Sequence, residues 1–425
     1  MAAVHSPICL SLFSGAGGLD IGLEQAGFQL LAQIEMDPDC SSTLLARSEV
    51  RGPRPLVIQK RIEDVDPARL LAQLKVLPGE LDLLAGGPPC QPFTTTGLRK
   101  GINDRRASST FPRYLEYVST LKPKAVVLEN VDGFLSAALR HRPLSKRGRR
   151  HPPLSWEESK GSFLHWFLAE LAGLGYSVAW GVLDSVGHGV AQFRQRAFLV
   201  GVVGEEPCFL PEETFGPGKG RPWRNLREAL AEVNDLGPIQ PLSERKRKVF
   251  ERIPEGGNWR DLPIELQEQT MGAAYHATGG KSGWWRRLSW DSPAPTVLGM
   301  PDHSSTALIH PDEDRCLSLN ECAAIQSFPT GTYFSGTSRS RYQQVGNAVP
   351  PRLGKAIGQH LMKFFSGERA PKAPPAPGWR RESANRRIGT HGWVTPKRAG
   401  IDFSVVAKAR PDSVWAKEGG QLELS

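Results

Sequence analysis

Short apolar runs alternate with glycine-rich loops and helix-spaced segments over the first 203 residues, and this alternation is the feature that most constrains the fold. The runs cover residues 8–13, 30–34, 81–85, 125–128, 177–183 and 197–203. Runs of this length are typical of buried strands. Strands that alternate with helices favour an open sheet covered by helices. We therefore predict an α/β fold for this part of the chain.

The alternation stops near Gly204, and the composition then divides the rest of the chain. We predict an α/β unit at 1–203 and a smaller irregular unit, rich in Pro, Gly and Trp, at 204–335. Residues 336–365 should return to the first unit, because Pro351 suits the start of a helix with an apolar stripe. The basic, Pro-rich tail 366–425 is predicted to be largely disordered, with 401–406 as a candidate strand.

Two of the predicted strands end in residues that can do chemistry. The run 81–85 leads into a loop of glycines and prolines that contains Cys90, and the run 125–128 leads into Glu129. Prolines fix φ, so the thiol would be held in place, as a nucleophile requires. If the strands are parallel neighbours, both residues meet at the carboxyl edge of the sheet, where such sheets bind ligands. Taken singly, a buried structural cysteine and a salt-bridged carboxylate are the ordinary alternatives.

The first predicted strand is followed by a glycine loop and a helix. Glycines stand at positions 15, 17 and 18, and Glu35 follows Gly15 by 20 residues. Nucleotide-binding folds place a carboxylate on ribose hydroxyls at this offset. A dinucleotide site of the GxGxxG type would need glycine where the chain has Asp20. The pattern therefore favours a cofactor that has a ribose and no pyrophosphate.

Basic residues gather at several places, and the formal charge of +9 suits a polyanionic partner. Gln192, Arg194 and Arg196 alternate, which predicts one face of a strand whose guanidiniums bind phosphate or polarise a ring carbonyl. The stretch 284–287 joins tryptophans to arginines, as nucleic-acid surfaces do. The segments 94–106 and 140–161 are basic loops that could contact a polyanion. Ordinary basic surfaces, solvated loops or a small core with a basic rim are the alternatives at these places.

Composition excludes several classes of protein. No run approaches the ~18 apolar residues of a membrane span, and no basic segment precedes an apolar leader, so we expect an intracellular protein. The six cysteines form no CxxC pair and no cluster at metal-ligand spacing. Neither disulfides nor a metal site is therefore expected.

Six motifs, in this order, resemble those of the DNA (cytosine-5) methyltransferase family over about residues 8–365. They are Phe13-Ser14-Gly15-Ala16-Gly17-Gly18, Glu35-Met36-Asp37, Pro88-Pro89-Cys90-Gln91, Glu129-Asn130-Val131, Gln192-x-Arg194-x-Arg196 and Gly346-Asn347-Ala348-Val349. The resemblance implies an S-adenosylmethionine-dependent methyltransferase (Rossmann-like) α/β sheet with a smaller inserted target-recognition domain. The first unit would be the catalytic and cofactor-binding domain, and 204–335 the target-recognition domain. S-adenosyl-L-methionine would be the cofactor and double-stranded DNA the substrate.

The resemblance also implies roles for individual residues. The catalytic residues would be Cys90 as the nucleophile at carbon 6, Glu129 as the donor to ring nitrogen 3, and Arg194 and Arg196 as cations. Contacts to the cofactor are implied for Phe13, Ser14, Gly15, Gly17, Gly18, Glu35, Met36, Ile62, Gly87, Pro89, Asn347 and Ala348. Contacts to nucleic acid are expected from Gln91, Thr94, Val131, Gln192, Trp284, Arg286 and Arg287.

Three positions depart from the family pattern. Arg61 stands before Ile62, where an acidic residue usually reads the adenine amino group, and Met36 replaces a tryptophan found in many members. Thr94 replaces the usual serine, and threonine also occurs there in the branch that methylates transfer RNA. A tRNA cytosine-5 methyltransferase is therefore one alternative, and a catalytically silent nucleic-acid-binding homologue is another.

We expect a sequence-specific enzyme, either an orphan or part of a restriction-modification system. It would act as a monomer in a bacterial-type cytoplasm, associated with the nucleoid, without a metal and away from membranes. A cognate restriction endonuclease is a candidate partner.

Overall fold

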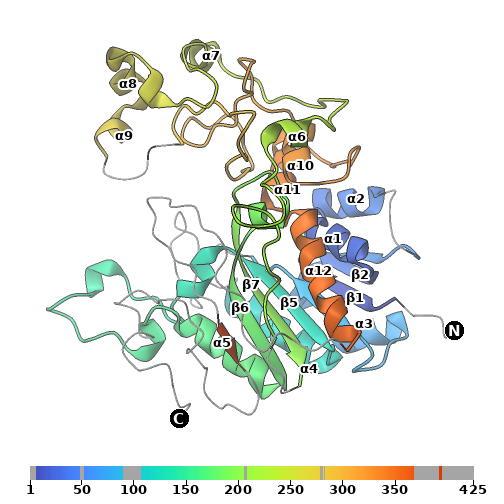
Figure 1. Ribbon diagram of the computed structural model, residues 1–425. Helices are drawn as coiled ribbons and strands as arrows, with labels where there is room; N and C mark the ends of the chain where they lie inside the picture. The colour runs from blue at the N-terminus through green and yellow to red at the C-terminus, as the bar shows by residue number, and fades with distance from the viewer. Residues whose placement is uncertain are drawn as a thin grey trace.

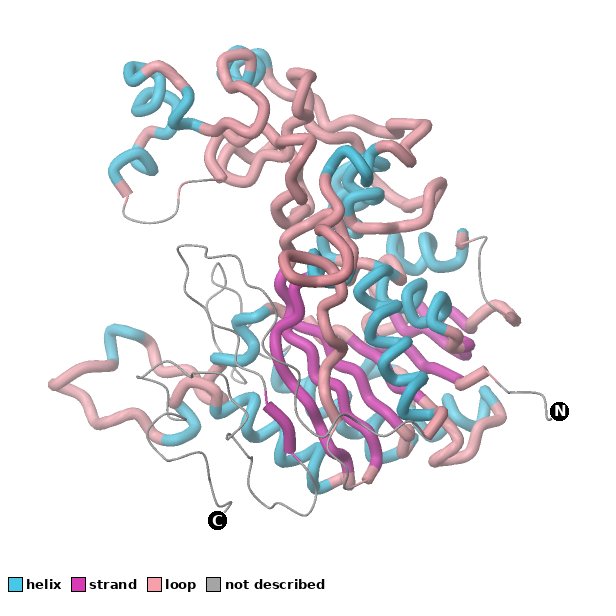
Figure 2. The backbone as a smooth tube through the Cα atoms, viewed as in Figure 1, coloured by secondary structure: helices cyan, strands magenta, loops and turns pink. Residues whose placement is uncertain are grey.

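The computed structural model describes residues 6–47, 52–89, 107–204, 208–277, 281, 283–367 and 392–394. Its centre is an eight-stranded sheet, which confirms the predicted α/β class (Figures 1 and 2). The strands are β1 (Ile8–Leu12), β2 (Gln29–Glu35), β3 (Leu56–Gln59), β4 (Leu83–Gly86), β5 (Ala125–Asn130), β6 (Tyr176–Asp184), β7 (Gln195–Val203) and β8 (Gly392–Val394). No helix among the described residues is long and apolar enough to cross a membrane.

The strand order is β3-β2-β1-β4-β5-β7-β6-β8. Strands β1 to β5 pair in parallel, whereas β7 runs antiparallel to both β5 and β6. The order reverses at β1, which lies between β2 and β4. Open α/β sheets bind ligands beside such a reversal, at the carboxyl ends of the strands.

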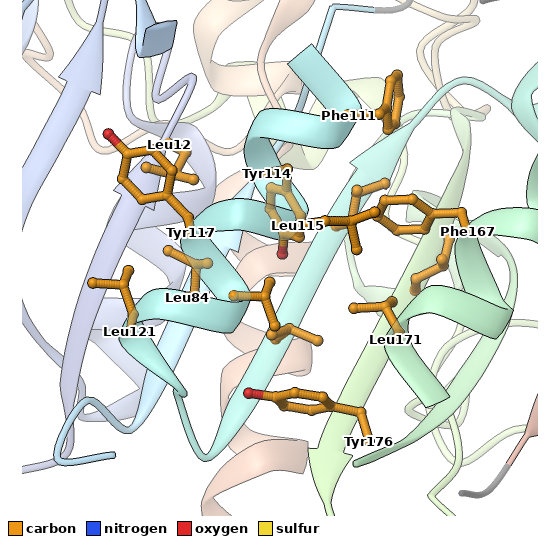
Figure 3. Close-up of a cluster of buried hydrophobic side chains, with 14 of the residues drawn as sticks. Leu12, Leu84, Phe111, Tyr114, Leu115, Tyr117, Leu121, Phe167, Leu171 and Tyr176 are labelled. Carbon is orange, nitrogen blue, oxygen red and sulfur yellow. The ribbon is translucent and has the colours of Figure 1, made fainter. Parts of the chain in front are cut away.

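Helices cover both faces of the sheet because side chains alternate between faces along each strand. Leu84 faces a core under α3 (Pro67–Leu74), α4 (Ala107–Leu121) and α5 (Ser162–Gly173). Figure 3 shows part of this core, with Tyr114 and Phe167 near the strands. Leu83 and Ala85 face the opposite core, under α1 (Gly18–Ala26) and α12 (Pro351–Phe365). Helix α2 (Pro38–Ala46) follows β2.

Helix α12 packs closely on α1. A Cβ on Gly22 would collide with Pro351 O, and a Cβ on Gly358 would lie 2.5 Å from Ala26 Cβ. Glycine at both positions lets the two helices approach. Helix α12 thereby lies in the layer that covers this face of the sheet.

Short helices and irregular segments fill residues 204–350, between β7 and α12, and lie above the sheet in Figure 1. We call these residues the inserted region. The helices are α6 (Leu226–Leu230), α7 (Glu244–Phe250), α8 (Ile264–Met271), α9 (Ala273–His276), α10 (Leu319–Ile325) and α11 (Ser338–Asn347). One core of this region includes Ala16 and Ile21 from the first unit, and a second core lies among α7, α8 and residues 284–316. The divisions at 203, 335 and 365 stay a prediction.

The predicted tail contains one difference from expectation. Residues 392–394 form β8, which pairs antiparallel with β6 and covers its open edge. An unpaired edge strand exposes backbone donors and acceptors, so this pairing satisfies them. The candidate strand 401–406 lies outside the described residues.

Candidate active site

The reversal in strand order brings the predicted site segments to one edge. Loop 13–17 follows β1, residues 87–89 follow β4, and β5 ends in Glu129 and Asn130 beside them. All three strands run parallel, so their carboxyl ends lie at the same side of the sheet.

The chain that leaves β4 lies directly against the end of β5. Asn130 Nδ2 donates a hydrogen bond to Pro88 O at 3.0 Å, and a Cβ on Gly87 would lie 3.2 Å from Glu129 Oε2. Cys90, Gln91 and Thr94 lie outside the described residues.

Glu129 combines burial with a neighbouring cation. Its side chain is 14% exposed, and Oε1 lies 3.1 Å from Arg196 Nε. Burial raises the pKa of this carboxyl above its usual value, and the charges of Arg196 and Arg194 offset only part of that rise. A carboxyl in these surroundings keeps its proton to higher pH, so it can donate to a substrate that gains negative charge.

The two predicted catalytic arginines have different partners. Strand β7 begins only at Gln195, so strand alternation does not extend back to Gln192. Arg196 faces Glu129, whereas the fully buried Arg194 side chain donates to three backbone carbonyls: Val297 O (3.2 Å), Gly346 O (2.7 Å) and Ala348 O (3.0 Å). The expected strand that includes Gln192 and Arg194 is therefore wrong, and the catalytic role of both arginines stays a prediction. Arg194 joins three segments and acts on Glu129 through its charge.

Gln192 is also buried, with no exposed surface. Its Oε1 accepts from Val297 N at 2.8 Å, and its Nε2 donates to Gln326 Oε1 at 3.0 Å. Gln326 Nε2 in turn donates to Val345 O at 2.7 Å. The expected contact between Gln192 and nucleic acid is corrected, because this side chain ties the inserted region to the sheet. We call Gln192, Arg194 and Gln326 the junction cluster.

The two arginines should respond differently to the same substitution. Arg194→Met leaves three buried carbonyls without this donor, so the free energy of unfolding should fall by about 3 kcal/mol or more. Arg196→Met should instead lower kcat, with an unfolding midpoint near that of the unaltered protein. Thermal denaturation and methylation rates of both variants test this. Equal stability of the two variants would contradict the assignment.

The glycine loop after β1 has unusual backbone conformations. Phe13, Gly15 and Gly17 have φ values of 56°, 53° and 77°. Gly15 N and Asp37 N each donate to the Glu35 carboxylate at 2.8 Å, so the predicted ribose ligand also holds the loop. Burial raises the pKa of Glu35.

The return segment reaches the same loop. A Cβ on Gly18 would collide with Val349 O and would lie 3.2 Å from Ala348 Cβ. Only glycine allows residues 348–349 to pack so closely against the start of α1. The sequence-predicted cofactor residues of the first and last motifs are therefore neighbours.

Two of the three departures from the family pattern, Met36 and Arg61, lie at the same edge, and Thr94 is outside the described residues. Met36 is 59% exposed beside Glu35, and Ile62 is 4% exposed. The Arg61 side chain is 56% exposed and lies 3.5 Å from a carboxylate oxygen of Glu63. In this chain the acidic residue, Glu63, follows Ile62, whereas the family usually has one before the isoleucine.

Asp20, which takes the place of a glycine of the dinucleotide pattern, lies at the centre of a buried hydrogen-bond group. It is fully buried and accepts from Ser11 Oγ at 2.7 Å and Gln33 Nε2 at 2.6 Å. Ser14 Oγ donates to Ser11 Oγ at 2.9 Å, which links the glycine loop to this group. Burial raises the pKa of Asp20. In the sequence, the signal for this role of Asp20 is a carboxylate among the apolar positions of a helix.

The expected nucleic-acid contacts separate into buried and accessible residues. Arg287 is 5% exposed, pairs with Asp314, and donates to carbonyls of distant segments, including Phe250 O (2.7 Å), Ile253 O (2.7 Å) and Glu313 O (3.0 Å). Its expected contact with nucleic acid is corrected, because it organises the core of the inserted region. Trp284, Arg286 and Val131 are partly exposed and stay candidates.

Comparison with known proteins agrees with this arrangement. The family described as C-5 cytosine-specific DNA methylase matches residues 8–363. Type II methyltransferase M.Sau96I of Staphylococcus aureus is 34% identical over 354 residues, covering 83% of this chain and 75% of that protein. Type II methyltransferase M.Eco47II of Escherichia coli is 31% identical over 365 residues, covering 84% and 79% respectively.

A solved structure shares the fold. The S. pombe Dnmt2 methyltransferase has a TM-score of 0.54 and 16% identity, covering 84% of this chain and 99% of that one. The family match includes every motif described here and the return helix up to residue 363. The chain therefore belongs to the C-5 cytosine-specific DNA methylase family and is a DNA cytosine-5 methyltransferase.

Proposed function

We propose that Cys90 and Glu129 carry the methylation chemistry, with Arg196 beside them. Carbon 5 of cytosine is too electron-poor to attack a sulfonium methyl group. Addition of the Cys90 thiolate to carbon 6 forms a C–S bond and pushes electrons into the ring, while Glu129 protonates nitrogen 3. Carbon 5 then becomes nucleophilic. The observation that carries the proposal is the buried Glu129 carboxyl, with its raised pKa, beside the loop that leads to Cys90.

Ionisation of Cys90 requires a favourable charge nearby. A free cysteine has a pKa of about 8.5 and is only a few per cent ionised at neutral pH. Arg196 supplies positive charge at this edge and remains 16% exposed. Once carbon 5 carries the methyl group, its proton leaves to a base, the C–S bond breaks to release the thiolate, and nitrogen 3 returns its proton to Glu129, which regenerates the enzyme.

We propose that S-adenosyl-L-methionine binds over the glycine loop, where it supplies an electrophilic methyl group. The residues fit this group, because a Cβ on Gly15 would meet no atom within 4 Å and the Glu35 carboxylate lies beneath the loop. Glu35 would bind the ribose and Phe13 the adenine. The other proposed contacts are Ser14, Gly17, Gly18, Met36, Ile62, Gly87, Pro89, Asn347 and Ala348.

A target cytosine must leave the duplex to reach this edge, at a cost of a few kcal/mol. We propose that 204–335 reads the target sequence and that Gln91, Thr94, Val131, Trp284 and Arg286 contact DNA. The relatives named type II methyltransferases support a place in a restriction-modification system. A monomer at the nucleoid in the cytoplasm, with a cognate endonuclease as partner, completes the proposal.

Labelled S-adenosylmethionine tests the substrate. With mixed-sequence duplex DNA, we expect label in the DNA, and bisulfite sequencing should place 5-methylcytosine in one sequence context. Label in transfer RNA alone would favour the tRNA alternative, and label in neither would favour a silent homologue. Unselective methylation of every context would contradict a sequence-specific enzyme.

A fluorinated target tests the covalent step directly. With 5-fluorocytosine in the target duplex and the methyl donor present, we expect the protein to become covalently attached through Cys90. A base can remove a proton from carbon 5 but cannot remove fluorine as a cation, so the C–S bond cannot break and the thiolate stays attached. Peptide mass spectrometry locates the attachment, and its absence from residue 90 would refute the proposed nucleophile.

A further inference from the structure

We propose that residues 140–161, here called the basic loop, form a second DNA-binding surface that grips phosphates of the duplex outside the target sequence. This inference rests on the proposed function, because it extends the same DNA substrate beyond the active site. It assigns a partner to a segment that the methylation chemistry does not use.

The basic loop is folded, and its base is closed by hydrogen bonds. Gly161 N and Phe163 N both donate to Ala137 O, at 3.1 and 3.2 Å, and Arg140 N donates to Glu157 O at 2.7 Å. The guanidinium of Arg142 crosses the interior and donates to Glu158 Oε1 (2.8 Å), Pro152 O (2.6 Å) and Pro153 O (3.3 Å). The loop therefore holds its shape before DNA arrives, which lowers the entropy cost of binding.

The loop concentrates positive charge that its own carboxylates do not neutralise. It contains seven Lys and Arg residues and two Glu residues, a net charge of +5 in a chain of +9. Glu157 pairs with Arg140 at 3.2 Å, and Glu158 pairs with Arg142, whose hydrogen bonds lower the pKa of Glu158 to about 2. Both carboxylates are thus occupied by the arginines that shape the loop.

Other cations of the loop lie at its surface. Lys146, Arg149 and Arg150 are exposed, and none of them has a carboxylate partner within the described ranges. Like charges held together on an ordered loop repel one another, and a polyanion removes that repulsion. The phosphate groups of DNA are a suitable polyanion, because they accept contacts from Lys and Arg regardless of base sequence.

The position of the loop suits a duplex that is engaged at the sheet edge. The chain reaches it directly from Glu129 through a short 3₁₀ helix, Asp132–Ser136. In Figure 1 the loop projects beyond α5, toward the same side of the view as α8 and α9 of the inserted region. A duplex held between the sheet edge and that region would continue past the loop, where phosphate contacts add affinity and no sequence information.

The test compares two variants that lose the same charge. The loop variant carries Lys146→Asn, Arg149→Asn and Arg150→Asn. The control carries Lys75→Asn, Lys122→Asn and Lys363→Asn, which are exposed residues near the amino ends of the strands and the last turn of α12. Asparagine tolerates the positive φ of Lys75 and Lys122. Binding of full-length protein to a fluorescent duplex of about four helical turns is measured across a salt series.

The loop variant should have a shallower salt dependence. Each lost phosphate contact lowers the slope of log K against log salt by about 0.9, so three contacts give about 2.7. Between about 50 and about 200 mM salt, the unaltered protein should lose roughly 40-fold more affinity than the loop variant. On a duplex of about one turn, the two slopes should converge.

Several results would overturn the inference. The first is an unchanged salt slope for the loop variant. The second is an equal fall of the slope in the control, which would show a general charge effect. The third is a fall of the slope with transfer RNA and none with duplex DNA. Thermal unfolding midpoints equal to that of the unaltered protein exclude misfolding. If the unaltered protein fails to methylate DNA, the proposed function fails, whereas the salt slopes still decide the role of the loop.

Discussion

Replacing Cys90 by serine is expected to abolish methyl transfer, with kcat lower by roughly 10⁴-fold or more. A hydroxyl does not ionise near neutral pH, so carbon 6 would lack its nucleophile and carbon 5 would stay unreactive. Affinity for duplex DNA should remain within a few-fold, because a single sulfur atom contributes little to phosphate binding. Single-turnover methylation and equilibrium DNA binding measure the two effects separately.

Cys40→Ser is the matched control for this variant. Cys40 is partly buried in α2, and burial together with nearby carboxylates raises its pKa, so it has no reactive thiolate. Its substitution should leave kcat unchanged. Loss of DNA binding together with activity in the Cys90 variant would show that Cys90 is structural instead.

Replacing Glu129 by glutamine is expected to lower kcat by about 10²–10⁴-fold. Glutamine keeps the size of the side chain and can donate a hydrogen bond, but it cannot transfer a proton to nitrogen 3. Glu170→Gln, on the exposed face of α5, makes the same change away from the site and should have no effect. Rates under saturating donor and DNA give the comparison, and a Glu129→Gln variant with unaltered kcat would remove the general acid from the mechanism.

The pH profile gives a second measurement on Glu129. Its acid form is populated below its raised pKa, so the rate should fall as pH rises through that value. Cys90 has the opposite dependence, because its thiolate increases with pH, and together the two groups give a bell-shaped profile. The glutamine variant should lack the decline on the alkaline side. A decline that persists in that variant would assign it to another group.

The strands, and the edge of the sheet at which the candidate site lies, could be predicted because both depend on patterns of residues that are close together in the sequence. Apolar runs located β1, β2 and β4 to β7 with small errors at their ends. Residues at strand ends, such as Glu129, follow once the strands are parallel neighbours. The sequence analysis does not predict strand β3 or helix α2, because β3 has only four residues and α2 has few apolar positions.

The roles of the buried arginines could not be predicted in the same way. Arg194 binds carbonyls at 297, 346 and 348, and Arg287 binds carbonyls between 250 and 313. These acceptors are distant in sequence, so no spacing rule reveals them. An arginine that folds a core and an arginine that grips phosphate look identical until the tertiary fold places the acceptors. Asp20 shows the same limit, because its partners come from two different strands.

The junction cluster has a consequence for how such enzymes diversify. Gln192 precedes β7, and through Gln326 it is linked to the carbonyl of Val345 where the chain comes back, so the two ends of the intervening polypeptide are fastened at one place. A foreign segment that replaced only residues between β7 and Gln326 would inherit the same anchorage. Because we propose that 204–335 reads the target, such an exchange would change the DNA sequence that is methylated and would leave the residues that transfer the methyl group in place.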